Sequence, residues 1–237
     1  MCNKSEDEMK NYISTLAGMP LFQGIEENDI LSLLNCLNGK VKSYTKDSII
    51  LFNGDDLQYM GIILSGHAHI LKEDILGNRN LISNLREKDL FGESLLCAGI
   101  EKSPLTIAAI TECEVLFLDF RPLIKTCPNT CSFHNKLIEN MLRIIANKNL
   151  FLNKKLSYLS CKSIREKLSA YLLDCFKDKG EYTFSINYNR NQLANFLSID
   201  RSAMCRELSK MKSDGIIDFW KNSFKIINLE ALAKGRE

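Results

Sequence analysis

The sequence lacks several features that would assign it to a well-defined class. No apolar run reaches the roughly 18 residues that a membrane-spanning helix needs. The first eight residues are polar and acidic and do not resemble a signal peptide, so we expect a cytoplasmic protein. There is no glycine-rich phosphate loop, metalloprotease motif or nucleophile elbow, which argues against the common enzyme classes.

Histidine is scarce, with three residues in 237, so a cupin-like enzyme with several His and Glu metal ligands has little support. Nine cysteines are present without a secretion signal, and they are expected to be reduced thiols. The apolar fraction of 45% excludes a disordered chain, and the length suits two modest domains.

The clearest motif is a helix-turn-helix in residues 190–208. Leu193, Ala194 and Leu197 give the first helix one apolar face, and Asp200 is a good N-cap for the second. The outward face of that second helix carries the candidate DNA-reading residues Arg201, Ser202, Cys205 and Arg206. Arginine makes bidentate contacts to guanine in the major groove. The alternative is a solvated helical hairpin.

A hairpin follows this motif and favours the DNA-binding interpretation. Gly215 is placed to end the second helix. Residues 216–220 and 224–227 are strand-like, with a turn at Lys221-Asn222-Ser223. The hairpin would form a wing, where Lys221 and Lys225 are candidates for phosphate contacts, as is Arg190 at the start of the first helix.

The charge is unevenly distributed along the chain. Residues 160–237 hold 14 Lys and Arg against 10 Asp and Glu, whereas the first 159 residues hold 17 against 19. A basic C-terminal region joined to a slightly acidic one fits double-stranded DNA as a partner.

The region from residue 41 to 120 predicts many short antiparallel strands. Apolar segments at 48–52, 61–64, 67–71, 81–85, 106–110 and 114–118 alternate with turn signals. Amphipathic helical segments precede them within residues 14–37. The strand spacing predicts a roll, barrel or sandwich, and a roll of this kind usually encloses a small-molecule pocket.

A long helix is predicted between residues 133 and 159. Its apolar positions recur in steps of four and three, with one polar member, at Ile138, Leu142, Ile145, Asn149, Leu152, Leu156 and Leu159. This heptad pattern predicts a coiled-coil seam in a homodimer, where a single Asn fixes register. The alternative is a core helix packed within one subunit.

The order of these parts resembles the cyclic-AMP-receptor and fumarate–nitrate-regulator (CRP/FNR) family of bacterial transcription regulators. The resemblance rests on residues 61–66, 89–93 and 200–208. It implies an α+β fold, with an effector-sensing β-roll over 1–125, a dimerisation helix and hinge over 126–160, and a winged helix-turn-helix over 161–237. It also implies a palindromic operator, and it leaves RNA polymerase open as a further partner.

The same resemblance places a candidate effector pocket at Gly92, Glu93, Lys102 and Ser103. In cyclic-nucleotide-binding members, Gly-Glu contacts the ribose and a later Arg holds the phosphate. Here the later segment has no Arg, and Lys is not an equivalent bidentate partner. The effector is therefore expected to be a small molecule or redox signal other than cyclic AMP.

A second candidate sensing site is Cys127, Cys131 and His134, which would share one face of a helix. Two thiolates and an imidazole suit haem, an iron–sulfur cluster or zinc. The alternative is that Pro128 starts the helix, the cysteines are buried, and His134 is a surface residue. His67 and His69 share a face of one predicted strand, and the solvent side is favoured for them.

Two functions other than regulated DNA binding stay open from the sequence. One is a redox, haem or metal sensing module with incidental DNA contact. The other is a cupin-like β-roll enzyme. The operator sequence, the effector and the choice between activation and repression are not encoded in any of these motifs.

Overall fold

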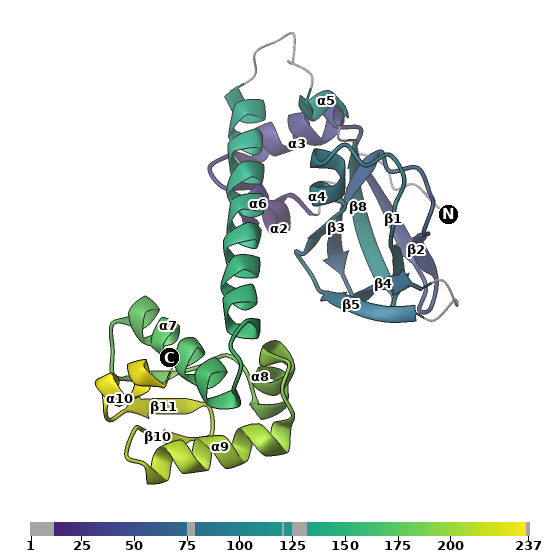
Figure 1. Ribbon diagram of the computed structural model, residues 1–237. Helices are drawn as coiled ribbons and strands as arrows, with labels where there is room; N and C mark the ends of the chain where they lie inside the picture. Colours follow the sequence, from purple (N-terminus) through teal and green to yellow (C-terminus); the bar gives the residue numbers. More distant parts are fainter. Residues whose placement is uncertain (1–11, 75–78, 120, 125–131, 236–237) are drawn as a thin grey trace. The chain divides into compact units, whose positions relative to one another are not determined.

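The structure is a computed structural model that describes residues 12–74, 79–119, 121–124 and 132–235. The chain divides into two compact units, Met1–Ala146 and Asn147–Glu237. The division falls inside the long helix α6 (Ser132–Leu159), so each unit contains about half of that helix (Figure 1). The assignment of residues 126–160 to a dimerisation helix and hinge stays a prediction.

The first unit contains two four-stranded antiparallel sheets, as the predicted roll requires. One has the order β1 (Lys40–Tyr44), β8 (Cys113–Asp119), β3 (Tyr59–Ser65), β6 (Leu90–Phe91). The other has the order β2 (Ile49–Leu51), β7 (Thr106–Ala109), β4 (Ala68–Glu73), β5 (Arg79–Leu85). Every pairing in both sheets is antiparallel.

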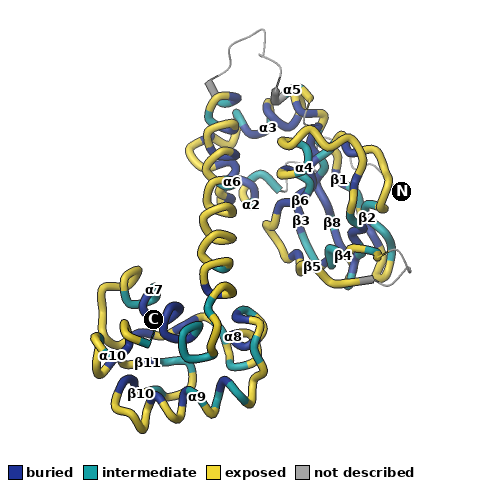
Figure 2. Tube along the Cα trace, in the orientation of Figure 1, coloured by how far each residue is buried: buried dark blue, intermediate teal, exposed yellow. Residues whose placement is uncertain are grey.

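Strand β3 is buried on both faces because it lies between two cores. Met60 and Ile62 join the core on the helical side, whereas Ile63 points into the core between the sheets. This follows from the alternation of side chains along a strand. Figure 2 shows dark stretches along β3 and β8, which are mostly buried.

The first unit also contains short helices. They are α2 (Ile13–Ala17), the 3₁₀ turn η1 (Pro20–Phe22), α3 (Glu27–Cys36), α4 (Glu93–Cys97) and α5 (Arg121–Ile124). Helix α3 has Glu27 and Asp29 in its first turn, where they suit the positive end of the helix dipole. Its apolar face buries Ile30 and Leu33 in the same core as β3.

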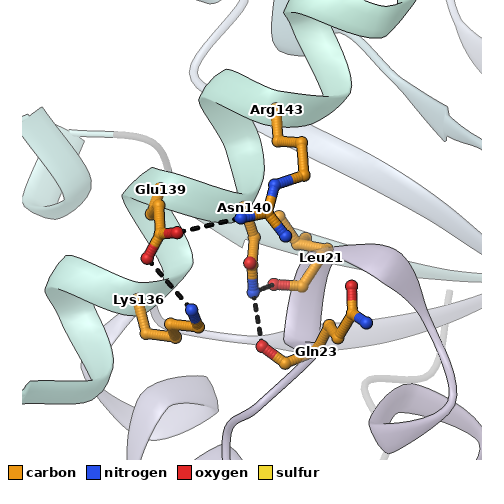
Figure 3. A network of polar contacts seen from close by, with 6 residues as sticks. All are labelled: Leu21, Gln23, Lys136, Glu139, Asn140 and Arg143. Carbon is orange, nitrogen blue, oxygen red and sulfur yellow. Dashed lines mark hydrogen bonds and ion pairs between the residues drawn. The ribbon is translucent and has the colours of Figure 1, made fainter.

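The first half of α6 is fixed to the N-terminal segment by a buried amide (Figure 3). The Asn140 side chain donates to the backbone carbonyls of Leu21 at 3.0 Å and Gln23 at 2.8 Å. Those carbonyls lie in and after η1, a one-turn helix that offers its carbonyl oxygens few backbone N–H donors. On the exposed side of α6, Glu139 pairs with Lys136 and Arg143, each at 3.0 Å.

The second unit contains the winged helix-turn-helix. Its elements are α7 (Ile164–Lys179), β9 (Thr183–Ser185), α8 (Arg190–Leu197), α9 (Arg201–Ser213), β10 (Ile217–Trp220), β11 (Ser223–Ile226) and α10 (Leu229–Lys234). The strands form a sheet of order β10-β11-β9. Helix α7 begins after the N-cap Ser163, so residues 160–163 separate it from α6. No helix in the described part of the chain is long and apolar enough to cross a membrane.

Candidate nucleic-acid interface

The first helix of the motif, α8, is closed at both ends by local hydrogen bonds. Asn189 and Gln192 form a capping box, each side chain accepting from the backbone N–H of the other at 2.9 Å. Ser198 ends the helix in the left-handed region, with φ of 52°. The chain then turns sharply and begins α9 three residues later.

The second helix, α9, begins as the sequence predicted. The Asp200 carboxylate accepts the backbone N–H of Ala203 at 2.7 Å. Met204 and Leu208 are buried in the core of the second unit. This register turns the side chains at Arg201 and Arg206 away from the core, so we call α9 the recognition helix.

The outward face of α9 presents two exposed arginines. Arg201, Ser202 and Arg206 are exposed, and Cys205 is half-buried against the core. Within the described residues, neither arginine takes part in an ion pair. Both guanidinium groups are therefore available to bases or phosphates.

The acids of α9 are neutralised on its other side. Arg165 of α7 places Nε 2.5 Å from Glu207 Oε1 and Nη2 2.7 Å from Asp214 Oδ2. These hydrogen bonds also raise the pKa of Arg165. Sequence reasoning missed this link because the partners lie 42 and 49 residues away. Its result is that the positive charge of the outward face is not offset by free carboxylates on the same helix.

The loop of the wing hairpin is shorter than predicted. Trp220 pairs with Ser223, so only Lys221 and Asn222 form the connection, and Ser223 belongs to β11. A loop of two residues is the commonest hairpin connection. Lys221 adopts φ of 49°, and its Nζ lies 5.9 Å from the centroid of the Trp220 ring. Lys225 is exposed on β11.

Arg190 has a different environment from the other candidates. Its guanidinium lies 4.9 Å from the ring centroids of both Phe219 and Phe224 in the wing. Burial lowers the pKa of this group. The residue thus packs the start of α8 against the wing, and a phosphate contact by Arg190 stays a prediction.

Two of the four candidate effector residues lie together at the start of α4. Gly92 is its N-cap, with φ of 82°, a conformation that favours glycine. Glu93 is 3% exposed and accepts a hydrogen bond from the Ser94 hydroxyl at 3.0 Å.

The other two candidates are engaged by neighbouring groups. Lys102 pairs with Asp56 at 3.1 Å. The buried Ser103 hydroxyl donates to the Leu105 carbonyl at 2.7 Å and lies 3.2 Å from the Leu105 nitrogen. A phosphate at this position would have to compete with both sets of contacts.

Only one member of the predicted Cys127, Cys131 and His134 group falls within the described residues. His134 is 5% exposed, so its interpretation as a surface residue is wrong. Its ring lies 5.2 Å from that of Phe133, and neither ring nitrogen has a hydrogen-bond partner in the described structure. The helix that contains it is described over Ser132–Leu159, and Pro128 lies outside the described residues.

The remaining two histidines lie at the start of β4. His67 is exposed immediately before β4, and His69 is half-buried on it. Throughout the described ranges, no three His, Cys, Asp or Glu side chains are grouped as metal ligands would be.

Comparison with known proteins covers both units. The model of the cyclic nucleotide-binding domain matches residues 41–128, and that of the Crp-like helix-turn-helix domain matches residues 166–234. Together these ranges include more than half of the chain. They correspond to the roll of the first unit and to the winged motif of the second.

Curated relatives match over most of their length. The chain is 22% identical over 205 residues to the cyclic AMP receptor protein of Thermus thermophilus, covering 85% of this chain and 89% of that protein. It is 22% identical over 186 residues to the transcriptional activator protein FnrL of Cereibacter sphaeroides, covering 74% and 71%.

A solved structure shows the same fold. The catabolite activator protein of Thermus thermophilus aligns with a TM-score of 0.50 at 19% identity, covering 92% of this chain and 98% of that one. The two domain models, the curated relatives and the exposed cationic face of α9 lead to one assignment. The chain belongs to the CRP/FNR family of DNA-binding transcription regulators.

Proposed function

We propose that this regulator binds a palindromic operator as a homodimer in the cytoplasm, controlled by a small-molecule or redox effector other than cyclic AMP, and that it is not an enzyme. The observation that carries the proposal is the outward face of α9. Arg201 and Arg206 are exposed there without acidic partners among the described residues. In a helix-turn-helix, this part of the second helix enters the major groove.

The homodimer is supported by apolar surface on α6. Leu142 is 64% exposed, and Leu152 and Leu156 are each 61% exposed, together with Leu150 and Phe151 beside them. Exposed apolar surface of this kind commonly marks a protein–protein interface. A second copy of the same helix covers it in a coiled coil, where Ile138, Leu142, Asn149, Leu152 and Leu156 form the seam.

The predicted seam residues differ in how far they are exposed. Ile145 is half-buried and packs against the core of the first unit. Asn149 is exposed, and its side-chain oxygen accepts from Asn153 at 2.7 Å. We therefore assign the strongest dimer contacts to the more exposed leucines rather than to Ile145.

Control by an effector belongs to the first unit in this proposal, at the level of Gly92 and Glu93 with Lys102 and Ser103. Cyclic AMP is not the effector, because the chain offers no arginine at the phosphate position and Lys102 is paired with Asp56. The metal or haem alternative rests on Cys127 and Cys131, which lie outside the described residues, and on His134.

The test of the proposal separates base reading from phosphate contact. Operator sequences are first selected from random duplexes, and the wild-type protein is titrated against the selected site and its single-base variants. Arg206→Ala should weaken binding by about 1–3 kcal/mol per half-site and relax preference at one base position. Lys221→Ala should weaken all sequences alike and lower the salt slope by about one.

Lys177→Ala is the matched control, since Lys177 is exposed near the end of α7, outside the motif and the wing. It should leave both affinity and preference unchanged. If Arg206→Ala lowers affinity uniformly, base reading moves to Arg201 and Ser202. If the wild type selects no sequence, the proposed operator binding is wrong.

A further inference from the structure

A cavity of about 420 Å³ opens between the two sheets of the roll, and its lining does not include the candidate effector residues. Its wall includes Tyr44, Tyr59, Phe91 and Phe117, and its rim includes Lys40 and Lys42. None of Gly92, Glu93, Lys102 or Ser103 belongs to the described lining. This volume lies within the range of small-molecule sites.

The apolar wall is a row of aromatic rings. Phe117 packs edge-to-face with Tyr44 at 6.4 Å and with Phe91 at 6.2 Å between ring centroids. Although Phe117 lies on β8, in the interior of its sheet, its side chain is only half-buried. We attribute this exposure to the open space that the ring borders.

Gly61 explains why the space is open. A Cβ atom on this residue would lie 1.9 Å from the Phe91 ring, so the ring occupies the place of a side chain directly on β3. A larger residue at 61 would push the ring away from the strand and into the interior of the roll. Glycine at this position lets the Phe91 ring pack directly on the backbone of β3, which leaves the cavity open.

The rim carries positive charge. Lys40, Lys42 and Tyr44 alternate along β1 and share one face. Lys42 Nζ lies 5.4 Å from the Phe117 ring centroid, at the border between the rim and the apolar wall. Within the described residues, neither lysine has an acidic partner, and the carboxylate of Asp56 in the lining is already paired with Lys102.

We propose that this cavity is a binding site for a small carboxylate with a planar apolar body. The apolar body would lie against the rings of Phe91 and Phe117, where burial of apolar surface favours binding. The carboxylate would lie at the rim beside Lys40 and Lys42, whose ammonium groups donate charge-assisted hydrogen bonds. A neutral molecule of the same shape would leave these ammonium groups without an anionic partner.

The site goes beyond the proposed DNA binding and does not depend on it. One contact connects the cavity to the candidate effector segment, because Asp56 lines the cavity and bonds Lys102, which adjoins Ser103. Occupancy of the cavity is therefore detectable from the backbone amide of Lys102 as well as from those of the wall.

The test compares 2-naphthoate with its neutral isostere 2-naphthamide on the full-length protein. Titration calorimetry gives the dissociation constants, and backbone amide shifts of Lys42 and Phe117 locate the ligand. We expect naphthoate to bind at least about tenfold more tightly than naphthamide, as a charge-assisted hydrogen bond allows. We expect the double variant K40Q/K42Q to lose that preference.

Lys72→Gln is the matched control, because Lys72 is exposed on β4 and does not belong to the cavity lining. It should bind naphthoate as the wild type does. The proposal is overturned if naphthoate does not bind, if naphthamide binds equally well, or if K40Q/K42Q retains the preference. Operator affinity, measured in parallel without ligand, shows separately whether the proposed DNA binding fails.

Discussion

Arg165 and Glu207 connect α7 to the recognition helix through a contact of 2.5 Å between Nε and Oε1. The same guanidinium reaches Asp214 beyond the end of that helix at 2.7 Å. One partly buried side chain thus fixes α9 near its middle and just past its last residue. We expect this attachment, together with the burial of Met204 and Leu208, to fix the orientation of Arg201 and Arg206.

We predict that Arg165→Met lowers the free energy of unfolding by about 1–2 kcal/mol, because two partly exposed carboxylates lose their counter-charge. Operator affinity should fall as well, since free Glu207 and Asp214 would repel phosphate. Urea unfolding and DNA titration measure the two effects. A double-mutant cycle with Glu207→Gln should give a coupling energy of about 0.5–1.5 kcal/mol. A cycle without coupling would contradict this account of the contact.

The seam of α6 can be tested without disturbing either core. We predict that Leu142→Glu combined with Leu156→Glu produces folded monomers, because both residues are more than half exposed in a single chain. Operator affinity should fall by about a hundredfold or more when the two half-sites are no longer bound together. Sedimentation equilibrium gives the oligomeric state.

Asn147→Glu, on another face of the helix, should remain dimeric. A double variant that still sediments as a dimer would remove α6 as the dimer interface.

Cyclic AMP should give no saturable heat in calorimetry at about 1 mM nucleotide, a concentration that detects any ligand of physiological affinity. The reason is the missing arginine and the engagement of Lys102 by Asp56. Micromolar binding by the wild type would prove the interpretation of this segment wrong.

The buried imidazole of His134 offers a test of metal or haem sensing. If Cys127, Cys131 and His134 form a sensing site, the joint change Cys127→Ser, Cys131→Ser and His134→Leu should abolish the metal, haem or redox response and leave folding intact. Absorption spectra and metal analysis of anaerobically purified protein give the result. Wild-type protein without metal or chromophore, or a triple variant that retains them, would favour buried thiols instead.

Acid should remove part of the stability of the first unit. Hydrogen bonds from Arg121, with Nη2 2.6 Å from Asp119 Oδ2, hold the pKa of the Asp119 carboxyl below its usual range. The folded state therefore binds this proton more weakly than the unfolded state. The resulting stabilisation is present above about pH 4 and is lost as the pH falls through the lowered folded-state pKa.

We accordingly predict that Asp119→Asn is less stable than the wild type at about pH 7, by about 1 kcal/mol, and that the difference shrinks toward about pH 3. Urea unfolding across this range measures it. Glu87→Gln, an exposed change in the same unit, should show no such convergence. A difference that stays constant with pH would mean that Asp119 acts by packing alone.

The DNA-binding motif was predictable because its signals are local. Asp200 caps α9 through Ala203, and Gly215, with φ of 69°, follows the end of that helix. Both lie within a few residues of the element that they define. The strands of the roll were predictable for a similar reason, since apolar alternation is visible within each short segment.

Other features depend on residues that are distant in sequence, and no local pattern reports them. Strand β9 is three residues long and is defined by pairing with β11, about 40 residues later. Asn140 reads as an ordinary polar residue on α6, yet it bonds carbonyls 119 and 117 residues away. The cavity beside Phe117 depends on Gly61, whose importance becomes visible only with the position of Phe91.

At Lys221, at the tip of the wing, the requirements of stability and of DNA binding conflict. Lys221 holds a left-handed backbone conformation that costs a side-chain-bearing residue about 1 kcal/mol and costs glycine almost nothing. Mutagenesis guided by heat resistance alone would therefore favour glycine at this position and discard the cation that the proposal directs to DNA. We therefore expect selection for thermal stability to favour glycine at residue 221, and selection for operator affinity to retain lysine there.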